Sequence, residues 1–300
     1  MTTGYKSQLD SADLALGLAR FVARVRENPE ISRAIQACDL PPGEAATLLA
    51  IYCNEAQTGL DLVAPLLSPA LRVLEIGCGI GVLARFLSEQ GIDLMGIEPG
   101  AAGFGFMPEI GAAILRLDPV RPQQQWLTIG AEQLDPAVHG QFDLIYSVNV
   151  LEHIPDLDGA FRGMRSVLAP GGNMIHSCPN YFVPYEPHFG IPLIPLWPRT
   201  TQRLFPKKVK KYPGIWDELN FITARRVKRL ARANGLRAHF ARGVLAQNLR
   251  RVECDERFSQ RQGHLASFVQ KCTYLPGFIS LLEKMPGDYL TPMVFRLSHD

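Results

Sequence analysis

The residues with the clearest chemical potential lie in the segment Val73–Gly81, VLEIGCGIG, where an apolar run gives way to three glycines. Such glycines let the backbone turn tightly and let a ligand approach its amides closely. Glu75 lies two positions before the first glycine, and its carboxylate would repel a pyrophosphate but attract an ammonium or sulfonium group. The spacing GxGxG differs from the GxGxxG of dinucleotide binders, and no GKS or GKT sequence follows it. The turn therefore favours a nucleoside with a cationic tail over NAD, FAD or ATP.

A second acidic residue, Glu98, follows at the end of the next apolar run, LMGIEPG. An acid roughly 20 residues after a glycine turn suits paired hydrogen bonds to the 2′,3′-diol of a ribose. Each hydrogen bond of this charged kind is worth roughly 1.5–3 kcal/mol. Glu75 and Glu98 together therefore predict a nucleoside site at the ends of two neighbouring strands.

Two histidines are candidates for a general base, because histidine is the side chain best tuned to accept a proton near neutral pH. His153 lies in the segment VLEHI, and His188 lies in the segment YEPHF. The sequence does not choose between them. His176 lies within an apolar run, and Asp143 begins another such run, so both are interpreted as structural.

The pattern from Leu71 onward predicts the elements that must position these residues. Short apolar runs alternate with helical windows, which is typical of a parallel sheet covered on both faces, with ligands at the carboxyl ends of its strands. The expected strands are Leu71–Ile76, Ile92–Ile97, Trp126–Ile129, Phe142–Val148 and Gly172–Ser177. The expected helices are Val82–Gln90, Met107–Leu115 and Leu157–Leu168.

Residues 1–68 are predicted to form a helical cap, because apolar residues recur there at helical spacing. Breaks are expected at Asn28–Pro29 and at Leu40–Gly43, and two further helices are expected over Glu44–Asn54 and Asp61–Leu67. Residues 69–180 form the predicted core.

Residues 179–216 hold eight prolines and many aromatic residues. This composition predicts an insertion, assigned to residues 181–220, that serves as a lid or acceptor wall, or else as a surface loop folded on its own side chains. Residues 221–300 are expected to complete the sheet through a helix at Thr223–Asn234, a strand at Leu236–Val244 and a returning antiparallel strand at Met293–Leu297.

The chain resembles class I S-adenosylmethionine-dependent methyltransferases of the type found in quinone and small-molecule methylation. The resemblance covers about residues 71–180 and implies a doubly wound α/β fold, with a seven-stranded, mainly parallel, Rossmann-like sheet whose last strand is reversed. It also implies S-adenosylmethionine as the methyl donor and S-adenosylhomocysteine as the product. Five blocks carry it in order: VLEIGCGIG, LMGIEPG, GAEQLD, FDLIYSVNVLEHIPD and LAPGGNMIHSCPN.

The resemblance also implies roles for individual residues. Gly130 occupies a position where many members of the family carry an acid that contacts the adenine. Some quinone-pathway members place a metal on two glutamates and a histidine around the loop that holds Glu152 and His153. Asn149 occupies one of those positions here, so no required metal is expected. The implied donor-site residues are Glu75, Gly77, Cys78, Gly79 and Gly81 around the methionine part and ribose, Glu98 on the ribose, Ile97 and Pro99 beside the adenine, Ala131 and Glu132 along its edge, and Ser147 and Asn149 at the reactive end.

Composition limits the partners and the location. With 31 Lys and Arg against 29 Asp and Glu, the chain carries a formal net charge of +2, so no global polyelectrolyte role is implied. Its six cysteines are widely spaced, and it has neither a run of about 18 apolar residues nor a signal-type N-terminus. These features favour a cytoplasmic enzyme with free thiols and no transmembrane segment.

A basic stretch bears on the acceptor. Between Arg199 and Arg257, sixteen Lys and Arg stand against five Asp and Glu. This stretch forms either a solvated face or a surface that attracts a partner. The partner would be an anionic small molecule or the surface of a membrane. The sequence SVNV replaces the Asp/Asn-Pro-Pro-Tyr/Phe signature of amine methylation, so O-methylation of a small, sugar-linked or lipid-linked acceptor is expected. RNA is a less favoured acceptor and DNA is not expected. A catalytically inactive partner subunit is the remaining alternative.

Overall fold

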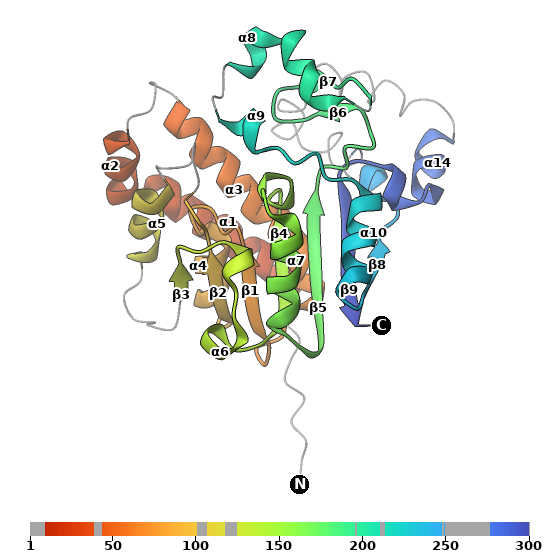
Figure 1. The fold of residues 1–300 in the computed structure, drawn as a ribbon. Coiled ribbons are helices and arrows are strands. Elements are labelled where there is room, and N and C mark those ends of the chain that lie inside the picture. Colours follow the sequence, from red (N-terminus) through yellow and green to blue (C-terminus); the bar gives the residue numbers. More distant parts are fainter. Residues whose placement is uncertain are drawn as a thin grey trace. The chain divides into compact units, whose positions relative to one another are not determined.

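The computed structural model describes residues 10–38, 44–100, 107–117, 125–195, 197–210, 214–247, 249 and 277–299. Seven strands form one sheet in the order β3-β2-β1-β4-β5-β9-β8 (Figure 1). The strands are β1 (Arg72–Ile76), β2 (Asp93–Ile97), β3 (Gln125–Leu127), β4 (Phe142–Val148), β5 (Leu168–Cys178), β8 (Leu236–Phe240) and β9 (Met293–His299).

The register of the central strands brings their carboxyl ends to one edge. Strand β1 pairs in parallel with both β2 and β4, and Glu75 lies opposite Gly96 and Tyr146. Strand β9 lies between β5 and β8 and points the opposite way from β5 (Figure 1). The predicted seven-stranded, mainly parallel sheet with a reversed last strand is therefore confirmed.

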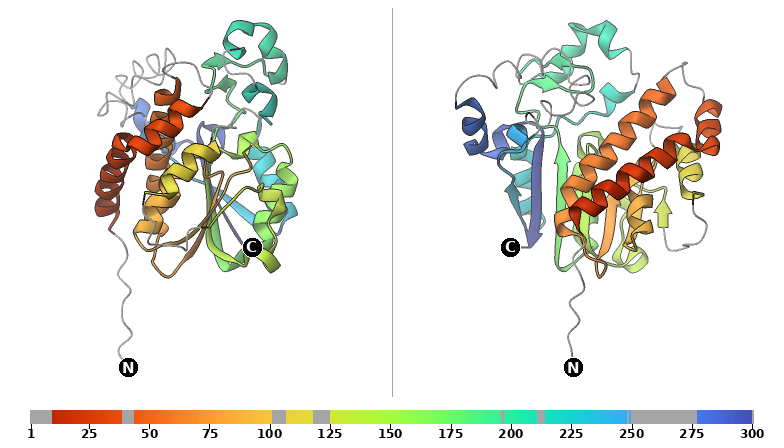
Figure 2. Two further views of the ribbon diagram at one scale, coloured as in Figure 1. Left: turned by 90° about the vertical axis from the view of Figure 1, so that its left-hand side faces the viewer. Right: turned by 180° about the vertical axis from the view of Figure 1, so that it is seen from behind.

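The contacts divide the described chain into two compact units. The first comprises residues 1–150 and 156–175, and the second comprises residues 151–155 and 176–298. In the first unit, α1 and α3 cover one face of the strands, and α7 covers the other (Figure 2). Its main helices are α1 (Ser11–Glu27), α2 (Pro29–Ala37), α3 (Glu44–Val63), α4 (Val82–Glu89), α5 (Met107–Leu115) and α7 (Leu157–Ser166), with a short α6 (Pro136–His139) and 3-10 turns η1 (Ala64–Leu66) and η2 (Ala131–Gln133).

The N-terminal helices share one hydrophobic core with the sheet. Leu18 and Phe21 of α1 are buried in the same cluster as Val73 of β1, and the rings of Phe21 and Phe86 lie 6.0 Å apart. Burying such side chains contributes roughly 1.5–3 kcal/mol each. The N-terminal helices are thus tied to the first unit by packing. The division into four segments that the sequence suggested stays a prediction.

The expected break between Glu44–Asn54 and Asp61–Leu67 is wrong, because α3 runs through Val63 and ends in the 3-10 turn η1. Gly59 lies inside the helix. A Cβ at Gly59 would lie 2.6 Å from a methyl group of Leu83. The glycine therefore permits close packing of α3 on α4, instead of ending the helix.

The second unit is built around aromatic contacts and one asparagine. Trp216 packs edge-to-face against both Phe189 and Phe221, with ring centroids 5.6 Å apart in each pair. Asn180 donates to the carbonyls of Asp288 and Leu290 and accepts from the amides of Phe182 and Ala224. The smaller elements here are β6 (Tyr185–Glu186), β7 (Ile191–Pro192), η3 (Leu151–His153), η4 (Pro198–Arg203), α8 (Pro206–Val209), α9 (Ile215–Glu218), α14 (Phe278–Lys284) and η5 (Gly287–Tyr289).

Helix α10 (Ala224–Ala233) carries much of the basic stretch in the second unit. The helix agrees within one residue at each end with the predicted Thr223–Asn234, and the Thr223 side chain caps its first turn. Arg226 donates to the carbonyl of Asn220, and Lys228 forms an ion pair with Asp288 at 2.5 Å. Part of the basic excess therefore has a structural use. Residues 211–213 and 250–257 of this stretch lie outside the described residues.

The described cysteines Cys38, Cys53, Cys78 and Cys178 carry free thiols, whereas Cys254 and Cys272 lie outside the described residues. Among the helices that the structure describes, none has the length and apolar character needed to cross a bilayer.

Candidate functional site

A small cavity lies over the glycine turn between β1 and α4, wholly within the first unit. Gly77, Gly79 and Gly81 have φ angles of 67°, 54° and 74°, a left-handed conformation that glycine adopts without strain. The amides of Gly77 and Cys78 donate to the carbonyl of Ile97 at 2.8 and 3.0 Å, which fixes the turn to the end of β2. The cavity is lined by Tyr52, Glu55, Ala56, Glu75, Gly77, Cys78, Gly79, Ile80, Val82, Leu83 and Val148.

Helix α3 supplies a wall of this cavity that no sequence motif indicated. A Cβ at Gly79 would lie 2.9 Å from the ring of Tyr52, so the helix covers the turn closely. One helical turn further on, Glu55 accepts a hydrogen bond from Nδ2 of Asn149 at 3.1 Å. Asn149 itself has a φ of 53°, which is uncommon for a residue with a side chain. The pair ties the end of β4 to α3.

Glu75 points its carboxyl group into a buried environment. Burial raises the pKa of Glu75 to about 8, and the hydroxyl of Tyr146 opposes part of that rise. The nearby carboxylates of Glu98 and Glu55 raise the pKa further. Three acids thus share one small region without a basic side chain lining the cavity. This arrangement favours a ligand that brings positive charge.

Glu98 is fixed against the same turn. Its Oε2 accepts from the amide of Gly79 at 3.0 Å, and its Oε1 accepts from the amide of Gly100 at 3.3 Å. Each carboxylate oxygen keeps a second lone pair for another donor. Burial raises the pKa of Glu98, and the two amides counteract part of that rise. The side chain is therefore held in place before any ligand binds.

Three other predicted donor-site residues, Ser147, Ala131 and Glu132, do not line this cavity. Ser147 is fully buried in β4. Ala131 is buried in η2, where its carbonyl oxygen would lie 2.0 Å from a Cβ placed on Gly163 of α7. Glu132 borders a separate, open cleft together with Asp156 and Arg162.

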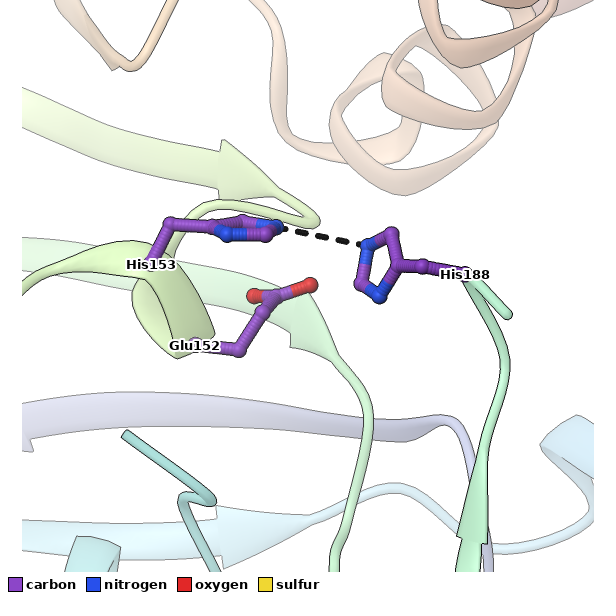
Figure 3. A group of neighbouring side chains, drawn as sticks. All are labelled: Glu152, His153 and His188. Carbon is purple, nitrogen blue, oxygen red and sulfur yellow. Dashed lines mark hydrogen bonds between the residues drawn. The ribbon is translucent and has the colours of Figure 1, made fainter. Parts of the chain in front are cut away.

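A cluster of two histidines and two glutamates forms in the second unit. Nε2 of His153 lies 3.3 Å from Nε2 of His188, and Figure 3 shows the Glu152 carboxylate beside both rings. Nδ1 of His188 lies 2.6 Å from Oε1 of Glu186. Glu152 and Glu186 are both fully buried. The structure therefore brings together the two histidines that the sequence could not rank.

The contacts of Glu186 define the state of His188. Glu186 also accepts from the hydroxyl of Tyr181 at 3.0 Å and from the amide of Phe189 at 2.7 Å. Because Glu186 acts as the acceptor in these contacts, we assign the proton between it and His188 to Nδ1 of the ring, which leaves a lone pair on Nε2. Burial and the nearby His188 ring lower the pKa of His153 to about 3, so His153 is neutral at pH 7. His176 is likewise buried and neutral, packed 5.4 Å from the ring of Phe295.

A family model described as a methyltransferase domain matches residues 47–239, well over half of the chain. The chain belongs to the methyltransferase family. The match confirms the resemblance to class I S-adenosylmethionine-dependent methyltransferases, and with it the type of enzyme and S-adenosylmethionine as the donor. The matched range includes α3 and therefore covers the whole lining of the cavity over the glycine turn.

Among curated relatives, this methyltransferase is 35% identical over 198 residues to the uncharacterized protein Rv1509 of Mycobacterium tuberculosis, covering 63% of this chain and 66% of the relative. It is 32% identical over 111 residues to the ubiquinone biosynthesis O-methyltransferase of Pseudomonas aeruginosa, covering 36% of this chain and 44% of the relative. The chain thus spans less than two thirds of the length of either relative.

Among solved structures, the magnesium protoporphyrin IX methyltransferase of Synechocystis with bound S-adenosylhomocysteine is 16% identical, with a TM-score of 0.44, covering 75% of this chain and 92% of that one. A phosphoethanolamine N-methyltransferase of Haemonchus contortus is 18% identical, with a TM-score of 0.43, covering 75% of this chain and 47% of that one.

Proposed function

We propose that this methyltransferase transfers the methyl group of S-adenosylmethionine to a hydroxyl oxygen of a small, sugar-linked or lipid-linked acceptor. The observation that carries the proposal is the row Glu186–His188–His153. A carboxylate that holds one histidine nitrogen and leaves the other as an acceptor is the arrangement that general-base catalysis needs. An amine acceptor that is already neutral has less need of such a base.

The chemistry requires little of the protein beyond placement and proton removal. The acceptor oxygen attacks the sulfonium methyl carbon in line with the breaking carbon–sulfur bond, and the positive charge on sulfur is neutralised as that bond breaks. Holding the reacting atoms in line supplies much of the rate. The two histidines of the row, whose Nε2 atoms lie 3.3 Å apart, take up the hydroxyl proton between them. Glu186 stabilises the charge that the row then carries.

The donor would lie over the glycine turn, with Glu98 holding the ribose diol and Glu75 facing the cationic methionine part. The raised pKa of Glu75 supports this orientation, because a positive ligand stabilises the ionised form of the carboxyl group. Pro99, Ala131 and Glu132 beside the adenine, and Ser147 and Asn149 at the reactive end, stay proposals drawn from the family resemblance. Tyr52 and Glu55 are added to them from the cavity lining.

An anionic acceptor is supported by the exposed side of α10, where Arg225, Arg229 and Arg232 face solvent. The name of the Pseudomonas aeruginosa relative agrees with oxygen as the methylated atom, over the part that is similar. A cytoplasmic location also stays a proposal, supported by the free thiols of the described cysteines.

The test is methylation of cell-extract fractions with donor carrying an isotope-labelled methyl group, followed by mass spectrometry of the products. We expect label in a small or lipid-linked molecule and loss of that signal in His188→Gln, whereas His239→Gln, which changes an exposed histidine on β8, keeps it. Label on an amine, on RNA, or on no molecule despite donor binding would contradict the proposal.

A further inference from the structure

Glu55 of α3 brings a carboxylate to the cavity over the glycine turn. Its Oε1 accepts a hydrogen bond from Nδ2 of Asn149 at 3.1 Å, so the carboxylate is held between α3 and the end of β4. Asn149 has a positive φ there, a conformation that the surrounding structure has to maintain. The contact therefore fixes Glu55 at the wall of the cavity. All of these elements belong to the first unit.

The surroundings of Glu55 strengthen the effect of its charge. The described residues that line the cavity include two acids, Glu55 and Glu75, and neither a lysine nor an arginine. The ring of Tyr52 lies so close to the turn that a Cβ at Gly79 would be 2.9 Å from it. Burial and the carboxylates of Glu55 and Glu98 raise the pKa of Tyr52, so its hydroxyl stays neutral. Because this ring replaces water beside the acids, a charge there is screened less.

The donor and the product of the reaction differ by one positive charge. S-adenosylmethionine carries a sulfonium group, whereas S-adenosylhomocysteine carries a neutral thioether at the same place. An ionised carboxylate near the sulfur therefore stabilises the bound donor more than the bound product.

Of the three acids around the turn, Glu55 is the one best suited to make this distinction. Two backbone amides already donate to the carboxylate of Glu98. Burial raises the pKa of Glu75 to about 8, so at pH 7 the attraction of a cation to Glu75 is partly offset by the removal of a proton. The charge of Glu55 should therefore report most directly on the charge of the ligand.

We propose that Glu55 is a specificity-determining residue that shifts the preference of the donor cavity toward S-adenosylmethionine and away from S-adenosylhomocysteine. When the methyl group is transferred, the electron pair of the broken bond stays on sulfur, and the attraction to Glu55 is lost. The residue thereby favours release of the product. This inference rests on the proposed position of the donor over the glycine turn, and it does not depend on the proposed O-methylation.

The test is calorimetry of the full-length chain at pH 7 with each of the two ligands, in the absence of an acceptor. In Glu55→Gln, which keeps the size of the side chain and removes its charge, the preference for S-adenosylmethionine over S-adenosylhomocysteine should fall about tenfold relative to the parent, equivalent to about 1.4 kcal/mol. Glu55→Asp keeps the charge and should retain most of the preference. Asp61→Asn removes a charge from an exposed position of the same helix and should match the parent.

Because partial unfolding of a variant weakens both affinities by the same factor, their ratio still reports on the site. An unchanged ratio in Glu55→Gln would overturn the inference. So would an equal loss of affinity for both ligands, which would show that Glu55 holds the ammonium group that they share.

Glu98→Ala separates this inference from the position of the donor. It should weaken both ligands together, because both contain the ribose. If it does so while Glu55→Gln leaves the ratio unchanged, the donor position stands and only the role of Glu55 is wrong. If neither variant changes either affinity, the donor position is wrong as well.

Discussion

The carboxyl group of Glu75 occupies a position where its own charge is unfavourable until a ligand arrives. Burial raises its pKa from an ordinary 4.5 to about 8. The folded chain therefore holds this proton more tightly than the unfolded chain does. The stabilisation from this proton is fully present below about pH 4.5 and is lost as pH rises to about 8.

We predict that Glu75→Gln flattens the pH dependence of stability. In the parent chain without ligand, Glu75 should lower the free energy of unfolding by up to about 1.4 kcal/mol per pH unit between about pH 5 and 8. The amide does not titrate, so the variant should lose this contribution. Thermal melts across that range measure the difference. Parallel pH profiles of the two proteins would show that Glu75 is ionised in the fold.

Glu98 should carry a measurable part of donor affinity. Its two oxygens are oriented by the amides of Gly79 and Gly100, and each retains capacity for a ribose hydroxyl. Loss of one such charged hydrogen bond, worth roughly 1.5–3 kcal/mol, corresponds to a roughly 10–150-fold weaker affinity. Calorimetry with S-adenosylhomocysteine compares Glu98→Ala with Asp93→Ala, an exposed acid at the other end of β2. Equal affinities for these two variants would contradict the placement of the ribose.

At this scale the sequence predicted the acids of the glycine turn, because the turn is local and its spacing is distinctive. Tyr52 and Glu55 could not be predicted. They reach the cavity through the packing of α3, which no short motif encodes. The pairing of His153 with His188 depends on the fold of the insertion, so the sequence offered both histidines without a relation between them.

Individual elements approach each other closely where glycine removes a side chain. Helix α7 packs on the turn η2 at Gly163, where a Cβ would lie 2.0 Å from the carbonyl oxygen of Ala131. Helix α1 has a glycine as well, but a Cβ at Gly17 would meet only the ring edge of Phe86 at 3.2 Å. Backbone cannot move aside as a ring can.

We predict that Gly163→Ala and Gly17→Ala differ strongly in stability. An added methyl group at Gly163 should cost about 1–3 kcal/mol or more of unfolding free energy, because it displaces η2. At Gly17 the gain of roughly 1 kcal/mol in helix propensity should offset the small shift of Phe86. Denaturant melts of both variants measure this. A Gly163→Ala protein as stable as its parent would mean that α7 and η2 are packed less closely.

The strands and most helices followed from periodicity, and α5 begins and ends at the predicted residues. The missed continuity of α3 has a physical cause. Gly59 disfavours a helix when it is considered alone, and only its contact with Leu83 explains its position inside one. No local pattern indicates the three hydrogen bonds through which the Asn180 side chain links distant segments of the second unit.

Across the whole molecule, the cavity over the glycine turn lies in the first compact unit, and the row Glu186–His188–His153 lies in the second. A ligand of the cavity should therefore stabilise mainly the first unit.

Hydrogen exchange measured by mass spectrometry tests this expectation. S-adenosylhomocysteine should slow exchange in α3 and in residues 75–85, and residues 181–190 of the second unit should exchange as they do without ligand. If the ligand protected both units equally, the molecule would respond as one cooperative body, and the assignment of the ligand to the first unit would be wrong.

The contact between Tyr52 and Gly79 matters to anyone who shortens this chain. A fragment starting at Leu71 would retain every glycine and both acids of the recognisable motif, and an alignment would score it as intact. It would nevertheless expose the back of the turn to water and remove α3 from the proposed nucleoside site. In this protein, the smallest fragment that a motif search would select is therefore shorter than the fragment that we expect to hold a nucleoside.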